Sequence, residues 1–123
     1  MLEAFRHIVH AVGHSIAGLV YMVRSENAAR IELLAIGLAF LWFWFLGRPL
    51  SNVLALLVLA CILLCVEAVN TAIEVIVDRI SPERSEFGKI AKDLGSTAVF
   101  FMLTACGLYV AAATADSFGL IAL

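Results

Sequence analysis

Charged residues are scarce in this sequence of 123 residues: Asp, Glu, Lys and Arg together make up 15% of it, and the formal net charge is −2. A small negative charge argues against bulk attraction to nucleic acid. Hydrophobic residues make up 63% and the mean hydropathy is +1.04, which is too apolar for an ordinary soluble protein of this length. The length suggests one domain, and the composition indicates a membrane protein.

Cysteine is too scarce for a disulfide framework. The three cysteines, Cys61, Cys65 and Cys106, lie in apolar runs, where an odd number argues against paired disulfides and favours packing roles. A cleaved signal peptide is not expected either, because charged residues and histidines interrupt the first fifteen residues.

Both common phosphate-binding loops are missing. The sequence contains no G-x-x-x-x-G-K-[ST] and no G-x-G-x-x-G pattern. A phosphoryl-transfer function would therefore need another architecture.

A polar stripe directly follows the uncharged run over 53–66. Five side chains at helical spacing form it: Glu67, Asn70, Thr71, Glu74 and Asp78. Each ionisable group in an apolar helix costs about 2.5–3.5 kcal/mol at the bilayer centre, so such groups usually face a protein interior and bind ions or do chemistry. The alternative is an interhelical hydrogen-bond seam, although two glutamates on one face exceed what a seam needs.

The hydrophobic pattern predicts an all-α membrane protein with a single embedded domain over 1–123. A helix over 1–25 has a wide apolar side and a polar side, which is typical of a helix that lies in the membrane interface. Three further helices, over 28–47, 50–80 and 90–115, are predicted to contain the membrane spans. Ser25 or Asn27 is expected to cap the first of these.

The surface helix carries three histidines, His7, His10 and His14, on one face. Their spacing covers two turns, and Glu3 is the only carboxylate near them. A solvated polar stripe is therefore a better interpretation than a transition-metal site.

The helix over 50–80 is longer than a bilayer is thick. Its 31 residues extend about 46 Å at 1.5 Å per residue, whereas the hydrocarbon core is about 30 Å thick. If the helix enters near Leu50, the core ends around residues 67–70. The polar stripe is therefore expected at the boundary between membrane and water.

The basic residues predict the orientation. Seven of the eight flank the amino-terminal end of the first span or lie between the second and third spans, and only Arg48 lies on the other side. By the positive-inside rule, the amino terminus and the 79–93 loop are cytoplasmic and the carboxyl terminus is outside.

The candidate polar groups converge on this cytoplasmic surface from three helices: Glu26, Arg30, Glu32, residues 67–78, Lys92 and Asp93. Carboxylates without His or Cys partners suit Mg²⁺ shared with substrate phosphates. A lysine at a helix start favours anions, and a carboxylate near the lipid could accept a hydroxyl proton. These residues alone predict a membrane enzyme or an ion-coupled protein with an acidic cytoplasmic site.

Two motifs extend this interpretation. The segment Glu67-x-x-Asn70-Thr71-Ala72-Ile73-Glu74-x-x-x-Asp78-Arg79-Ile80, followed by Ala91-Lys92-Asp93-x-Gly95-Ser96-x-Ala98-Val99, resembles the bacterial integral-membrane diacylglycerol kinases. The upstream Glu26-x-x-x-Arg30-x-Glu32 has matching spacing. The resemblance implies a homotrimeric bundle of three-span subunits in the bacterial inner membrane. It also implies transfer of the ATP γ-phosphoryl group to a lipid alcohol, with active sites shared between subunits.

The resemblance implies a role for each matching residue. Glu67 corresponds to the general base, and Glu26 and Glu74 correspond to the Mg²⁺ ligands. The implied nucleotide contacts are His14, Glu26, Glu74, Glu83, Arg84, Ser85, Lys92 and Asp93. The implied lipid-substrate contacts are Ser15, Arg30, Glu32, Glu67, Asn70 and Ser96.

Two alternatives stay open at this stage. The neighbourhood of Glu26 is also similar to the undecaprenol kinases, and His7 stands where diacylglycerol kinases have an arginine, with Arg6 beside it. An oligomer that conducts cations along an acidic ring is the non-enzymatic alternative. It does not explain Lys92 and Asp93.

Overall fold

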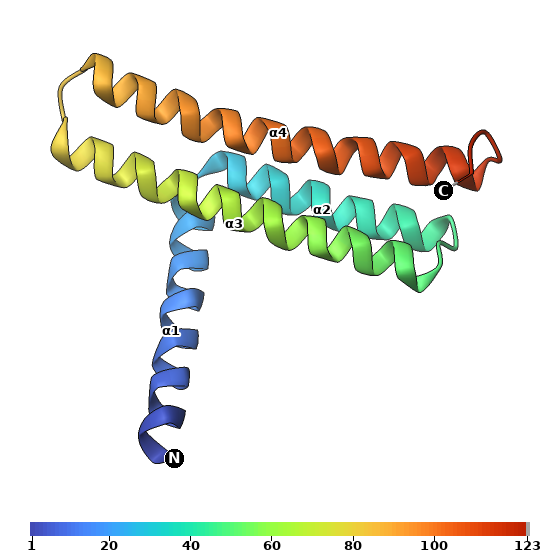
Figure 1. The fold of residues 1–123 in the computed structure, drawn as a ribbon, viewed down its shortest axis with the longest axis horizontal. Coiled ribbons are helices and arrows are strands. Elements are labelled where there is room, and N and C mark those ends of the chain that lie inside the picture. The colour runs from blue at the N-terminus through green and yellow to red at the C-terminus, as the bar shows by residue number, and fades with distance from the viewer. Residues whose placement is uncertain (123) are drawn as a thin grey trace.

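The computed structural model describes residues 1–122, without the side chains of Leu2 and Ala4; the predicted domain also includes Leu123, which lies outside the described residues. The chain forms four helices: α1 (Leu2–Ser25), α2 (Asn27–Phe45), α3 (Leu50–Ile80) and α4 (Glu86–Ser117). The last three run side by side, with α3 antiparallel to both α2 and α4 (Figure 1). Each of the three is long and apolar enough to cross a membrane. The part of the chain that the model describes is free of strands. The predicted all-helical class with three spans is confirmed.

The helix α1 leaves the other three at a steep angle where α2 begins (Figure 1). The break is at Glu26, which is extended with φ −109° and ψ 121°. The expected side-chain cap from Ser25 or Asn27 is wrong, because Glu26 occupies the N-cap position of α2 and makes no such bond. The Ser25 hydroxyl instead donates to the carbonyl of Tyr21 at 2.9 Å, within α1.

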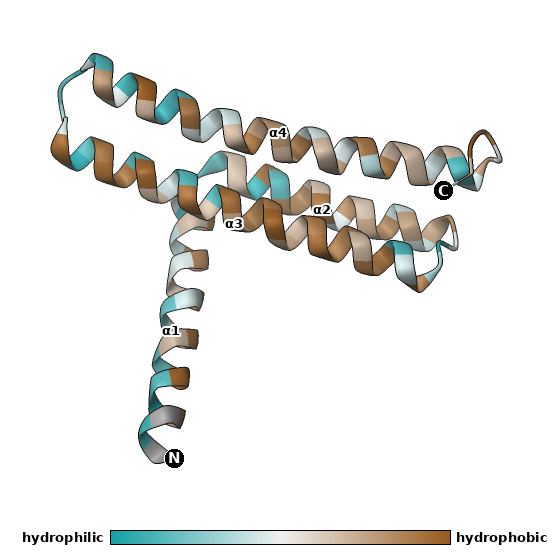
Figure 2. Ribbon diagram, viewed as in Figure 1, coloured by the Kyte–Doolittle hydropathy of each residue, from teal (hydrophilic) through white to brown (hydrophobic). Residues whose placement is uncertain are grey.

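The apolar side chains of α1 are exposed in the single chain. Examples are Phe5, Ile8 and Ile16, which are 68%, 62% and 58% exposed. Figure 2 shows the hydrophobic residues of α1 on the side towards which α2 extends, and the hydrophilic residues on the opposite side. The helix is thus amphipathic in three dimensions as well as in sequence.

The connection between α2 and α3 is a tight turn. Gly47 has φ +63°, a left-handed conformation that glycine adopts without steric cost. The amides of Gly47 and Arg48 donate to the carbonyls of Trp44 and Phe43 at 3.1 and 3.0 Å, which is the Schellman pattern of helix termination. The turn places α3 antiparallel to α2.

The small hydrophobic core lies at this end of the bundle. Phe43, Leu56 and Ala113 are buried together, one from each of α2, α3 and α4. Arg48 reaches across to α4, where it lies 2.7 Å from a carboxylate oxygen of Asp116. This ion pair links the α2–α3 turn to the last turn of α4.

The other end of the bundle is a hairpin of α3 and α4, which extends past the point where α1 departs (Figure 1). The Ser85 hydroxyl caps α4 by accepting from the amide of Gly88 at 3.1 Å. Because of this cap, α4 begins at Glu86, about a turn before the predicted residue 90. A Cβ on Gly88 would lie 3.0 Å from Val77 Cγ1, so glycine permits the close approach of α3 and α4 here.

Candidate active site

The polar stripe of α3 changes from buried to exposed along the helix. Glu67, Asn70 and Thr71 are buried, Glu74 is half-buried, and Asp78 is exposed. Glu32 of α2 is also buried. The stripe therefore faces the interior between the helices at its membrane end and water at its other end.

Like charges gather around Glu67. The negative charges of Glu26 and Glu74 act on Glu67, and the charge of Glu67 acts on Glu32. In an apolar bundle such repulsion is screened less than in water. An arrangement of this kind favours a bound cation or a proton.

Asn70 is held between Glu74 and Gly95. Its side-chain nitrogen donates to Glu74 Oε1 at 3.2 Å, and its buried oxygen Oδ1 has no hydrogen-bond partner among the described residues. An ideal Cβ on Gly95 would overlap that Oδ1. The lack of a side chain at Gly95 thus makes room for Asn70.

The role of Gly95 cannot be predicted from spacing. The residue belongs to the motif after Lys92, but its contact with Asn70 depends on the register between α3 and α4. Only its position among the motif residues could have indicated it.

Lys92 joins the acidic cluster from α4. Its ammonium nitrogen lies 2.5 Å from Asp78 Oδ1, and the charges of Glu74 and Glu26 also attract it. Asp93 points elsewhere and pairs with the exposed Lys89 at 2.5 Å. The structure therefore brings Lys92, but not Asp93, to the carboxylates of the same chain.

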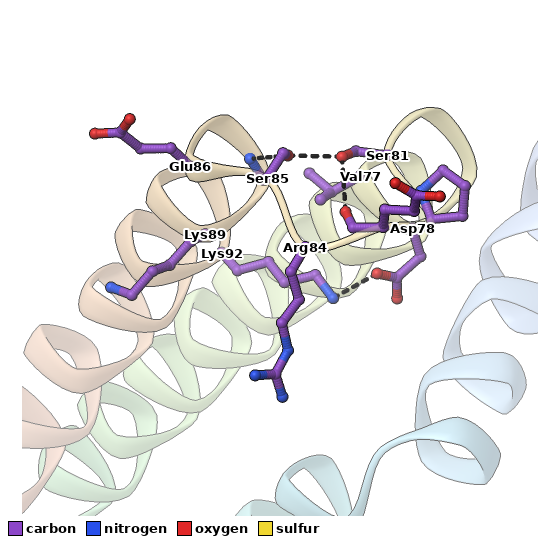
Figure 3. A pocket seen from close by; sticks show the side chains of 11 residues that line it. Val77, Asp78, Ser81, Arg84, Ser85, Glu86, Lys89 and Lys92 are labelled. Atoms are coloured by element: carbon purple, nitrogen blue, oxygen red, sulfur yellow. Dashed lines mark hydrogen bonds and ion pairs between the residues drawn. The ribbon is translucent and has the colours of Figure 1, made fainter.

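A cleft of about 650 Å³ opens between the end of α3 and the start of α4. Four residues predicted to contact a nucleotide line it: Glu83, Arg84, Ser85 and Lys92. The Arg84 side chain extends to the same side as the Lys92–Asp78 pair, whereas Glu86 points away (Figure 3). The Ser85 hydroxyl is already engaged, since it caps α4 and lies 2.6 Å from the Ser81 hydroxyl.

Four other predicted site residues are exposed in the single chain: His14, Ser15, Arg30 and Ser96. Ser15 donates to the carbonyl of Ala11, and Arg30 donates to the carbonyl of Arg24 at 3.3 Å. Within residues 1–122, no hydrogen bond or ion pair joins any of the four to Glu67 or Glu74.

The donor set is suited to a hard cation whose coordination a substrate completes. No group of three or more His, Cys, Asp or Glu residues in the described chain gathers in a metal-binding arrangement. Mg²⁺ is commonly held by only one or two carboxylates together with substrate phosphates. Glu26 and Glu74, whose charges both act on Glu67, have carboxylate oxygens of the kind that this ion prefers.

Comparison with known proteins places the chain in a family. The model of the family described as "Prokaryotic diacylglycerol kinase" matches residues 13–114, which include the whole α3 stripe, the cleft and Lys92. A diacylglycerol kinase of Sinorhizobium sp is 42% identical over 106 residues, which are 86% of this chain and 77% of that protein. The diacylglycerol kinase of Pseudomonas aeruginosa is 40% identical over 100 residues, 80% of each chain.

A more distant relative agrees. The diacylglycerol kinase of Escherichia coli K12 is 35% identical over 99 residues, which are 80% of this chain and 81% of that protein. These matches span about four fifths of each chain, and the family model covers the buried carboxylates Glu32 and Glu67. The chain therefore belongs to the prokaryotic diacylglycerol kinase family.

Proposed function

We propose that this membrane protein transfers the γ-phosphoryl group of ATP to the hydroxyl of diacylglycerol, which yields phosphatidic acid and ADP. The observation that carries the proposal is the gradient along α3, from Glu67 at 2% exposure, through half-buried Glu74, to exposed Asp78. This order suits a reaction between a lipid in the bilayer and a nucleotide in water. Family membership supports the lipid.

Glu67 is the proposed general base. Its carboxylate takes the proton of the diacylglycerol hydroxyl while the hydroxyl oxygen attacks the γ-phosphorus of ATP. The bond from that phosphorus to the bridging oxygen breaks, and ADP leaves. Burial suits Glu67 to this role, since removal from water makes a carboxylate a better proton acceptor.

Glu26 and Glu74 are the proposed ligands of Mg²⁺, which when bound neutralises charge on the transferred phosphoryl group. Asn70 steadies Glu74 by its hydrogen bond. The Lys92 ammonium group would move from Asp78 towards the ATP phosphates, because its flexible side chain lets it change partners.

The remaining predicted site residues are assigned either to the nucleotide or to the lipid. The 650 Å³ cleft suits the nucleotide, so we assign to it Glu83, Arg84 and Ser85. His14 and Asp93 are proposed nucleotide contacts, and the proposed lipid contacts are Ser15, Arg30, Glu32, Asn70 and Ser96.

The membrane placement uses the shape of the molecule. The α3–α4 hairpin extends past α1, whose exposed apolar side faces in the direction in which α2 runs (Figures 1 and 2). We propose that α1 lies in the cytoplasmic interface of the bacterial inner membrane and that the hairpin projects into the cytoplasm. The excess of basic residues at that end supports a cytoplasmic amino terminus and an outer carboxyl terminus.

A homotrimer is the proposed assembly. Asp93, Ser96 and Arg30 are exposed and, within residues 1–122, form no hydrogen bond or ion pair with Glu67, although the proposed reaction uses all of them. In a homotrimer, a neighbouring chain would supply these residues to the site around Glu67. The small residues of α4 suit close helix contacts in lipid.

The function is tested by incubating the purified protein with ATP, Mg²⁺ and diacylglycerol in mixed micelles. Phosphatidic acid is the expected product, and a parallel reaction with undecaprenol should be slower. If folded protein forms no phosphatidic acid in this assay but conducts cations across vesicle membranes, a conducting oligomer would be favoured instead.

Glu67→Gln should lower kcat by about 10²–10⁴-fold, the usual contribution of a general base, and leave the Kd for ATP nearly unchanged. The glutamine keeps the size of the side chain and one acceptor oxygen but cannot accept the proton. Steady-state kinetics and nucleotide titration measure the two effects. Near-normal kcat in folded protein would exclude Glu67 as the base, and a large rise in Kd for ATP would place it in the nucleotide site.

Glu74→Gln should reduce activity by about 10²-fold or more and raise the Mg²⁺ concentration needed for half-maximal rate, because a metal ligand is lost. Glu3→Gln, which makes the same chemical change on α1, is the control and should have little effect. Unaltered Mg²⁺ dependence in folded Glu74→Gln protein would remove Glu74 from the metal site.

Gly95→Ala should lower activity because its methyl group would displace the Asn70 side chain, and with it the hydrogen bond to Glu74. Gly37→Ala on α2 is a steric control, since a Cβ there meets no atom within 4 Å. In an Asn70→Ala background the Gly95→Ala change should cost little more, as expected for one shared contact. Additive losses in this double-mutant cycle would show that Gly95 acts independently of Asn70.

Mixed oligomers test the shared site. Glu67→Gln and Asp93→Asn subunits, each inactive alone, should regain up to about a quarter of wild-type activity when mixed equally, if Glu67 and Asp93 come from different chains of a symmetric oligomer. Subunit exchange is verified with differently tagged chains. Exchange without any recovery of activity would show that one chain supplies both residues.

A further inference from the structure

A second cavity lies within the membrane-spanning part of the bundle, separate from the cleft between α3 and α4. Its volume is about 280 Å³, and residues of α2, α3 and α4 line it. Glu32 is the one charged lining residue, and the others are aliphatic residues, Gly107 and Cys106. The cavity is thus an apolar space with a single carboxyl group.

Small residues leave this space open. Ala35 and Ala39 of α2, Ala60 of α3 and Gly107 of α4 lie on its walls. A Cβ added to Gly107 would meet no atom within 4 Å. Ala35, Leu103 and Gly107 are exposed in the single chain, so the space is a groove open to the surface, and its small side chains leave room for an occupant.

The carboxyl group lacks a partner within the described chain. Glu32 is 5% exposed, and its oxygen Oε2 is buried without a hydrogen bond from any described residue. A buried polar group without a hydrogen-bond partner destabilises a protein, so an occupant that pairs with Glu32 would be favoured. As a carboxylate it accepts a hydrogen bond from a hydroxyl, and as a carboxylic acid it donates to an ester carbonyl. Both groups occur in the glycerol part of diacylglycerol.

The cavity runs from the catalytic end of the bundle into the membrane. Glu67 follows the lining residue Leu63 by one turn on the same face of α3, and its charge acts on Glu32. From Glu32 to Ala39 the wall of α2 extends about 10 Å. An amphiphile with its polar end beside Glu67 would therefore have an apolar chain inside the cavity.

We propose that this cavity is the slot for one acyl chain of the lipid substrate, with Glu32 hydrogen-bonded to an ester carbonyl of the glycerol part. The inference rests on the proposed lipid-kinase function and adds a determinant of acyl-chain specificity. One chain in the slot would hold the reacting hydroxyl beside Glu67, while the other chain stays in the bilayer.

Two substitutions narrow the slot from opposite walls: Gly107→Leu on α4 and Ala39→Leu on α2. Each should raise the KM for dioleoylglycerol about tenfold, without a matching change in the KM for ATP, and should shift preference towards short-chain diacylglycerols. Gly37→Leu is the control, because Gly37 is exposed on α2, meets no atom within 4 Å and does not line the cavity.

The same variants can overturn the proposal. An unchanged KM for dioleoylglycerol in both, with equal or higher melting temperature, would show that the cavity is only a packing void. Loss of oligomers in both, while the Gly37→Leu control assembles normally, would show that a second copy of the chain fills the space.

A binding test separates this inference from the proposed function. In a Cys61→Ala, Cys65→Ala background, Cys106 is the only thiol, and it lines the cavity. Dioleoylglycerol at ten times its Kd should slow the alkylation of Cys106 by N-ethylmaleimide about tenfold. Protection without phosphatidic acid formation would contradict the proposed function but support the slot; phosphatidic acid formation without protection would overturn the slot alone.

Discussion

The burial of two carboxyl groups inside an apolar bundle is the constraint on which the rest of the structure depends. Glu32 and Glu67 are almost fully removed from solvent, and their charges repel each other. A buried ionisable group destabilises a fold unless a partner offsets its desolvation. The chain keeps both groups and provides Glu32 Oε2 with no partner among residues 1–122. Proton transfer by Glu67 and lipid binding by Glu32 would explain why the chain retains two buried carboxyl groups that destabilise the fold.

The contact between α3 and α4 determines what surrounds these carboxyl groups. Gly88 and Gly95 permit the two helices to approach closely, at Val77 and at Asn70. The approach orients Asn70 towards Glu74 and brings Lys92 to Asp78. A shift of one helix along the other would separate Lys92 from Asp78 and Gly95 from Asn70 together, so these contacts between helices are a property of the hairpin rather than of any single residue.

Local periodicity was sufficient to predict the parts of this structure that depend on one helix. The spacing of Glu67, Asn70 and Glu74 places them on one face of any helix, and the cost of charge in an apolar segment predicts that the face is turned inwards. The family resemblance, drawn from the motifs around these residues and Lys92, is confirmed by the match over residues 13–114.

Contacts between helices could not be predicted in this way. The Asn70–Gly95 approach and the Arg48–Asp116 ion pair depend on the register of distant segments, about which local spacing carries no information. The start of α4 is a different case. Ser85 followed by Glu86 is a recognisable helix start, but the many charges of that segment favoured a loop prediction.

If the same residues serve both assembly and catalysis, an activity measurement alone does not separate the two roles. Exposed apolar side chains do not drive helix association in lipid, because lipid tails are equally apolar, so subunit contacts depend on packing and on polar groups. Asp93 and Ser96 are exposed in the single chain and belong to the proposed site. A substitution there can remove activity by removing a substrate contact or by separating the subunits. The oligomeric state must therefore be measured for each inactive variant before its residue is assigned to the chemistry.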